Sequence, residues 1–211
     1  MGVYRTVCYK VEDAFIKVIA KNSDPNEVNN KVLTYRQDKE EQRRTKKQEA
    51  QARAIERKKQ QEMKKEKEHQ EVKSLLTKLV DLEHTGYTNY EYDEVRKNSV
   101  FFRKLLSHIF DKDERGLTFI QCEFDKTKNK EIKGYLIATN YRVWFVSKDL
   151  EFSQKLRYQT IKEVRPFKDS LLEKGLFIQY GTKKLEFDEI FDKEQFRKLI
   201  EVLNKQLTQF Q

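Results

Sequence analysis

Two stretches near the C-terminus decide the fold: GYLIATNYRVWFV, residues 134–146, and LEFSQKLRYQTIKEV, residues 150–164. Both are rich in β-branched and aromatic residues, which favour strands. In the second stretch, Leu150, Phe152, Leu156 and Tyr158 alternate with polar residues, a pattern typical of a strand with one solvent-exposed face. The links between these segments are too short for parallel crossovers, so the sequence predicts antiparallel strands.

The same period of two extends outward from these stretches. It predicts strands at residues 117–124, 131–139, 141–147, 150–158, 161–166, 175–181 and 183–188. A closing helix then begins with Asp192 as N-cap and Gln195 at N3, and Phe191 and Phe196 stand at the positions of a hydrophobic staple. Its apolar residues fall on one face, Phe196, Leu199, Ile200, Leu203 and Leu207, which suits a helix that plugs one open end of a curled sheet.

Seven short strands and a closing helix follow the order of the pleckstrin-homology superfold, and residues 114–211 resemble small bacterial pleckstrin-homology-like and GRAM-like domains. The resemblance is carried by a hairpin with Gly134, Thr139 and Arg142, and by the spacing of Phe152, Tyr158, Ile161 and Val164. Asn140 stands where an acidic residue is common in that family. The resemblance implies a binding module rather than an enzyme.

In lipid-reading members of this superfold, the basic loop between the first two strands receives an anionic head group. The matching residues here are Lys126, Lys128, Lys130 and Lys133, the candidate ligand- or partner-binding residues. Lysines are point charges without the bidentate fork of arginine, and Asp125 and Glu131 lie in the same loop. The alternative is a soluble hairpin tip that only prevents aggregation.

Before this domain, the chain is predominantly helical in pattern. Residues 1–24 fit either a strand or one helical face, and the longer pattern favours a helix from about Thr6. Asp24-Pro25-Asn26-Glu27 is a helix start with a capping box. Because neither Pro nor Gly follows until Gly86, one long charged helix is expected over residues 25–85, and residues 86–113 form a connector and an amphipathic helix from about Ser99.

The middle of the long helix, residues 36–70, contains 13 basic and 8 acidic residues. Only Ile55 and Met63 are large apolar side chains there, so the heptad seam of a sustained coiled coil is missing. Basic residues can bind phosphates and make nucleic acid a candidate partner, but the acids are interspersed and no aromatic side chain is available for base stacking. A solvated spacer is the competing interpretation.

Two apolar stripes are candidate sites of helix-mediated interaction. They comprise Leu75, Leu76, Leu79 and Leu82 in the long helix, and Phe101 and Phe102 in the amphipathic helix. For the leucines, packing on the C-terminal domain is favoured over a dimer seam, because three turns are short for stable self-association. For the aromatic stripe, core packing is favoured over insertion into a membrane interface.

Composition narrows the remaining classes of function. The net charge of +9 allows an acidic protein, an anionic membrane surface or nucleic acid as partner. Cys8 and Cys122 form no disulfide framework or metal motif, so we expect a reducing, cytoplasmic environment. No apolar run is long enough to span a bilayer, and peripheral membrane association is the alternative to a purely cytoplasmic location.

No nucleophile–base pair, glycine-rich phosphate loop or paired buried carboxylates are recognisable, so no catalytic residue, metal or cofactor is expected. The sequence thus predicts an α+β protein, in which a long charged helical region precedes a pleckstrin-homology-like antiparallel β-barrel or sandwich capped by a C-terminal helix. The leading hypothesis is an adaptor or inhibitor-like protein, from a bacterium or phage, that binds a protein partner. Peripheral membrane binding, nucleic-acid binding and homo-oligomerisation through the helices are alternatives.

Overall fold

A computed structural model describes residues 3–20, 24–127, 130–168 and 174–210. The helices are α1 (Val3–Ile19), α2 (Pro25–Leu79), α3 (Asn89–Lys97), α4 (Ser99–His108) and α5 (Lys193–Phe210). The chain divides into two compact units, Met1–Met63 and Lys64–Gln211. The first part of α2 therefore belongs to unit 1 with α1, and its last turns belong to unit 2.

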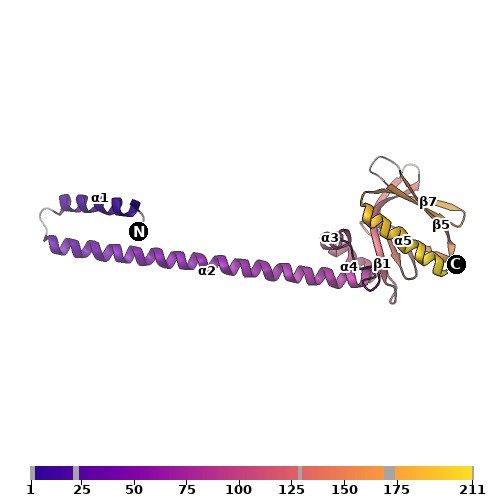
Figure 1. The fold of residues 1–211 in the computed structure, drawn as a ribbon, viewed down its shortest axis with the longest axis horizontal. Coiled ribbons are helices and arrows are strands. Elements are labelled where there is room, and N and C mark those ends of the chain that lie inside the picture. Colours follow the sequence, from indigo (N-terminus) through magenta and orange to yellow (C-terminus); the bar gives the residue numbers. More distant parts are fainter. Residues whose placement is uncertain (1–2, 21–23, 128–129, 169–173, 211) are drawn as a thin grey trace. The chain divides into compact units, whose positions relative to one another are not determined.

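Unit 1 is a helical hairpin, in which α1 lies beside the first part of α2 (Figure 1). The N-terminal segment is thus helical, as the longer of its two sequence patterns predicted. Arg36 of α2 joins the helices: its guanidinium bonds Asp13 at 2.8 Å and lies 4.4 Å from the centroid of the Tyr9 ring. None of the described residues of unit 1 is buried, so the hairpin holds no core of its own.

The start of α2 follows the sequence signal, and its end does not. Asp24 accepts a hydrogen bond from the Asn26 amide at 3.0 Å and so caps the helix. We expected the helix to continue to residue 85, but it ends at Leu79. The prediction was wrong because the Asp81 amide bonds the Leu117 carbonyl of the sheet at 3.1 Å, which diverts the chain into a turn.

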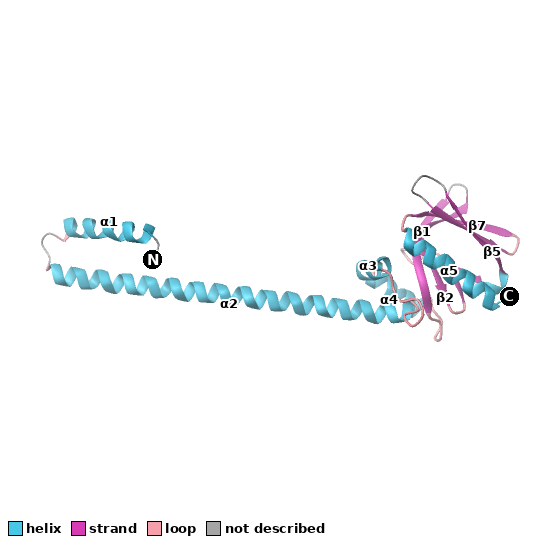
Figure 2. Cartoon of the chain, viewed as in Figure 1, coloured by secondary structure: helices cyan, strands magenta, loops and turns pink. Residues whose placement is uncertain are grey.

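The sheet of unit 2 contains seven antiparallel strands in the order β4-β3-β2-β1-β7-β6-β5. Figure 2 draws the strands in magenta, beside the closing helix α5. The strands are β1 (Gly116–Thr127), β2 (Lys130–Thr139), β3 (Arg142–Ser147), β4 (Ser153–Arg157), β5 (Ile161–Lys168), β6 (Lys174–Tyr180) and β7 (Lys183–Ile190). A short 3₁₀ helix, η1 (Tyr158–Thr160), separates β4 from β5. With the preceding long helix and the closing α5, this is the predicted α+β, pleckstrin-homology-like architecture.

Both faces of β1, β2 and β3 are buried. On one face, Leu136 and Phe145 pack with α5 in the first core cluster. On the other face, Phe119, Tyr135 and Trp144 pack with the end of α2, with α3 and with α4 in the second core cluster. Burial on both faces explains why β2 and β3 contain the apolar runs Tyr135–Ala138 and Val143–Val146 rather than a strict alternation.

The fourth of the predicted strands, residues 150–158, is correct in its core and wrong at its start. β4 begins at Ser153, and Leu150 lies in the preceding turn with a positive φ of 66°. Leu150 packs against the second core cluster, whereas Phe152 packs against the first. The two side chains therefore lie on opposite sides of the sheet, although period-two spacing placed them on one face.

The closing helix α5 begins as predicted, with the Gln195 amide donating to Asp192 Oδ1 at 2.8 Å. The predicted hydrophobic staple is wrong, because Phe191 is exposed while Phe196 is buried in the first core cluster. The side chain of Gln195 also does not return to the cap. It is buried and donates to the Phe119 carbonyl of β1.

Helix α3 was not predicted, because residues 86–98 were treated as a tyrosine-rich connector. Thr88 and Glu91 form a capping box at its start: the Glu91 amide donates to Thr88 Oγ1 at 3.1 Å, and the Thr88 amide donates to Glu91 Oε2 at 2.8 Å. The next helix, α4, begins at the predicted Ser99.

Candidate functional site

The four candidate lysines belong to the β1–β2 hairpin, and the structure describes them unequally. Lys128 lies outside the described residues. Lys126 and Lys130 lie within β1 and β2, and their side chains are likewise outside the description. A basic cluster at this hairpin tip therefore stays a prediction for Lys126, Lys128 and Lys130. Of the four candidates, only Lys133 has a described side chain.

Lys133 is paired with two carboxylates. Its ammonium bonds Glu123 of β1 and, at 3.0 Å, Glu189 of β7. The hydrogen bonds that it donates to Glu123 and to Glu189 raise the pKa of Lys133 above its ordinary value. Glu189 has a positive φ of 51°, so the end of β7 adopts a conformation that non-glycine residues seldom take. Lys133 thus links β2 to β1 and to the end of β7.

A hollow of about 590 Å³ lies beside this hairpin, between the start of β2 and the β3–β4 turn. Its charged lining residues are Glu131, Lys133, Lys148, Asp149 and Glu151. The hydrogen bonds from the Ser147 hydroxyl and from the Glu151 amide lower the pKa of Asp149, which keeps this carboxylate ionised. Since carboxylates outnumber lysines here, the described part of the hollow does not present the uniformly positive surface that an anionic head group requires.

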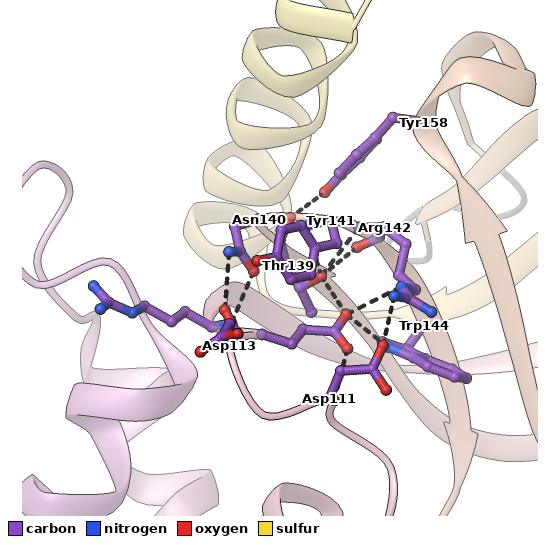
Figure 3. Close-up of polar contacts among 10 residues, drawn as sticks. Asp111, Asp113, Thr139, Asn140, Tyr141, Arg142, Trp144 and Tyr158 are labelled. Atoms are coloured by element: carbon purple, nitrogen blue, oxygen red, sulfur yellow. Dashed lines mark hydrogen bonds and ion pairs between the residues drawn. The ribbon is translucent and has the colours of Figure 1, made fainter.

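The motif residues Thr139 and Arg142 form a closed polar cluster rather than an open site (Figure 3). The buried carboxylate of Glu114 accepts hydrogen bonds from Thr139 Oγ1 at 2.7 Å and from Trp144 Nε1 at 2.9 Å. Arg142 pairs with Asp111 at 2.7 Å. The Tyr158 hydroxyl donates to the Thr139 carbonyl at 2.7 Å.

This arrangement fastens the loop before β1 to the β2–β3 turn. The donors and acceptors named above already have partners within the protein, so the motif stabilises the fold and offers little to a ligand. Sequence reasoning recognised Thr139 and Arg142 by resemblance but gave no role to Glu114, which comes from a distant loop.

The candidate helical residues are mostly part of the core. Leu75, Leu76, Leu79 and Phe102 are buried in the second core cluster, and Phe101 packs against it half-buried. The leucine stripe therefore packs on its own domain, and these four side chains are not accessible to a partner. Leu82, which lies in the turn after α2, is the exception because it is 38% exposed.

Leu82 borders a groove that sequence reasoning did not find. This groove, which we call the turn groove, has a volume of about 590 Å³ and lies between the turn after α2 and the β2–β3 turn. Tyr141, 43% exposed, is the second exposed large apolar side chain of its described lining. Its charged lining residues carry both signs, namely Asp81, Glu83, Asp113 and Arg115. An exposed aromatic residue in a tight hairpin turn was the available sequence signal.

The pKa shifts of two described groups, Asp81 and Cys122, have local structural causes. His84 Nδ1 contacts Asp81 Oδ1 at 3.0 Å at the protein surface. Burial, which alone would raise the pKa of Asp81, is outweighed by hydrogen bonds from His84, so the pKa is lowered. Burial raises the pKa of the Cys122 thiol, which makes this cysteine a poor nucleophile.

Within the described ranges, no group of three or more His, Cys, Asp or Glu side chains is placed to bind a metal ion. None of the helices, over the part of the chain that is described, combines the length and apolarity needed to cross a membrane.

Several solved structures resemble the chain. They include the C-terminal domain of an unknown protein from Leishmania infantum, with 17% identity and a TM-score of 0.42, covering 53% of this chain and 98% of that one. The Vps36 N-terminal PH domain matches with 14% identity and a TM-score of 0.39, covering 48% and 84%. A protein with a pleckstrin-homology domain from Shewanella loihica matches with 12% identity and a TM-score of 0.35, covering 53% and 91%.

No curated protein gives a significant match to the sequence. The model of one protein family, described as the GRAM domain, matches residues 96–209. The match starts near the end of α3 and reaches almost the end of α5, so it includes α4 and the complete sheet. Because this region is more than half of the chain, the protein belongs to the GRAM domain family.

Proposed function

We propose that this chain is a non-enzymatic adaptor that binds a protein partner through the turn groove of unit 2. The observation that carries the proposal is the exposure of Leu82 and Tyr141 in one groove bordered by charges of both signs. Exposed leucine and tyrosine side chains beside mixed charges match the composition of protein interfaces, where an apolar centre is surrounded by a polar rim.

Recognition of an anionic lipid head group is the weaker alternative. Lys133 is held by Glu123 and Glu189, and a head group would have to displace these carboxylates or bind beside them. The neighbouring hollow adds Glu131, Asp149 and Glu151, which repel phosphate. These contacts favour a protein partner over a membrane surface.

Nucleic-acid binding through the charged part of α2 is supported less well. The described side chains from residue 41 to residue 63 are all exposed, as expected of a solvated helix. Ion pairs such as Arg53 with Glu49 at 3.9 Å place acids among the bases along the helix. A continuous positive face, which phosphate binding needs, is therefore interrupted.

A reducing, cytoplasmic location fits this adaptor role. Cys8 and Cys122 are both free thiols, and the protein needs no disulfide for its core. Peripheral contact with a membrane stays the alternative, and the vesicle experiment below distinguishes it.

The test is affinity purification of the tagged full-length chain from cells that produce it, with the co-purifying proteins identified by mass spectrometry. We expect a specific partner that is lost with the variant Leu82→Ser/Tyr141→Ser. The matched control is Val100→Ser, because Val100 is also an exposed apolar residue of unit 2 but lies outside the turn groove. This control should retain the partner.

Flotation with phosphatidylserine vesicles tests the alternative, binding of an anionic lipid head group. The proposal fails if the full-length chain floats and the variant Lys126→Glu/Lys128→Glu/Lys130→Glu/Lys133→Glu does not. The domain would then bind anionic lipid. The proposal also fails if the partner binds the groove variant as well as it binds the unaltered chain.

A further inference from the structure

Helix α1 carries an apolar stripe that none of the described residues of unit 1 covers. Val7, Val11, Phe15 and Val18 are between 55% and 67% exposed. The side of α1 that meets α2 is a different one: it includes the Tyr9 ring and the Asp13 carboxylate, both of which contact the Arg36 guanidinium. At about 100° per residue, the stripe and this contact side lie on roughly opposite faces of the helix.

The spacing of the stripe is that of a helix–helix seam. Val7, Val11, Ala14 and Val18 follow one another by four, three and four residues, which is the spacing of d and a positions in a heptad. Phe15, at an e position, widens this apolar face on the side away from Lys10 and Lys17. The heptad spacing of the other residues favours another helix as the occupant of this face.

The charges beside the seam restrict what kind of helix fits. Lys10 and Lys17 lie one heptad apart along one edge of the seam, at g positions. Among the described residues, neither lysine has an ion pair. The acids of α1 are already used, because Asp13 and Glu12 both face Arg36, at 2.8 and 3.5 Å. The charges available to a partner at this seam are therefore basic.

A second copy of the chain does not satisfy these lysines. In a parallel pair, the g positions of one helix face the e positions of the other, and these are Cys8 and Phe15. In an antiparallel pair, g positions face each other and would bring lysines together. Neither arrangement supplies a carboxylate.

We propose that the exposed face of α1 docks an amphipathic helix of a partner protein, with an apolar a/d seam flanked by acidic residues that pair with Lys10 and Lys17. The absence of any buried side chain among the described residues of unit 1 supports this: the hairpin has no core, and a partner helix would supply one. This surface is distinct from the turn groove, and each can be tested without the other.

The probes are two synthetic heptad peptides with the same apolar a and d positions, one with Glu and one with Lys at every e and g position. Binding to the full-length chain is measured by fluorescence anisotropy. We expect the Glu peptide to bind about fivefold more tightly or better, since two favourable pairs replace two repulsive ones. Added salt should reduce the difference.

Two pairs of variants test the residues. Lys10→Glu/Lys17→Glu should reverse the preference between the peptides, whereas Lys46→Glu/Lys47→Glu, the same charge change on exposed residues of α2, should preserve it. Val11→Ser/Phe15→Ser should abolish binding of both peptides, while Ile55→Ser, which changes an equally exposed apolar residue of α2, should not. Because the charge reversal leaves every apolar contact intact, misfolding cannot imitate its result.

The proposal is overturned if both peptides bind equally, if neither binds, or if Lys10→Glu/Lys17→Glu leaves the preference unchanged. Sedimentation with phosphatidylserine vesicles that Val11→Ser/Phe15→Ser abolishes would instead identify a membrane as the occupant. A dimeric mass in light scattering that the same variant converts to a monomer would identify a second copy.

Discussion

Gly134 shows how a single position of the hairpin motif is constrained by backbone rather than by a ligand. A Cβ atom at this position would lie 2.4 Å from the Val146 carbonyl oxygen and 2.7 Å from Cζ of Phe145. The strands β2 and β3 pair there, so the backbone atoms cannot move aside without breaking the ladder. Glycine is therefore required for strand pairing.

Replacing Gly134 by alanine should lower the free energy of unfolding by about 2 to 3 kcal/mol through overpacking against the backbone of β3. Gly86→Ala is the matched control, since an added Cβ there meets nothing within 4 Å and only its positive φ of 65° is unfavourable. It should cost about 1 kcal/mol. Urea denaturation measures both, and equal losses for the two variants would contradict the backbone clash.

The polar residues of the same hairpin could be recognised from the sequence, but their partners could not. The resemblance identified Thr139 and Arg142. Their partners Glu114 and Asp111 belong to a loop earlier in the chain, which comes next to the hairpin only when the sheet has folded. A carboxylate in a loop has no local pattern that distinguishes a buried acceptor from a solvated charge. Burial of Glu114 depends on tertiary contacts alone.

At the scale of elements, α3 is fixed to α5 and β1 by a buried polar network. Glu91 is fully buried; it bonds Lys198 of α5 at 2.7 Å and accepts a hydrogen bond from Thr118 of β1 at 2.7 Å. Lys198 also donates to the Gly86 carbonyl at 2.7 Å. The network therefore unites the connector, the sheet and the closing helix.

Lys198→Met should lower the free energy of unfolding by about 3 kcal/mol, because the Glu91 carboxylate would stay buried without its cation. Lys205→Met, at an exposed position of the same helix, should change it by less than about 0.5 kcal/mol. Both are measured by urea denaturation. In the double variant Glu91→Gln/Lys198→Met, a loss smaller than the sum of the single losses is expected; strict additivity would argue against the pair.

Element types were predictable where the local pattern was strong. The seven strands, the start of α2 at Pro25 and the capping of α5 by Asp192 all follow from alternation and cap residues. Helix α3 was missed although Thr88 and Glu91 form a capping box, because too few apolar residues follow to show helical periodicity. The end of α2 was missed because Asp81 bonds a strand, and no local residue signals that contact.

At the scale of the molecule, the sheet needs cover on both faces. Helix α5 covers one face, and the last turns of α2 with α3 and α4 cover the other. The compact unit accordingly begins at Lys64, whereas the sequence suggested a domain that begins at residue 114. Two fragments distinguish these boundaries.

The fragment 64–211 should fold cooperatively, whereas the fragment 114–211 should be strongly destabilised and should bind the dye ANS. The shorter fragment would expose apolar side chains of the second core cluster on the sheet, namely Phe119, Tyr135, Ile137, Trp144 and Val146. Urea denaturation and ANS fluorescence measure the difference. If the two fragments were equally stable and neither bound ANS, the helices would be dispensable and the shorter domain would be correct.

Trp144 makes the contact between the sheet and its helices observable by spectroscopy. It is the sole tryptophan of the chain and packs in the second core cluster, and its indole N–H donates a hydrogen bond to Glu114. Its fluorescence therefore reports from one known place, where the loop before β1, the hairpin motif and the helical cover meet. Any event that separates these three parts becomes visible without a label.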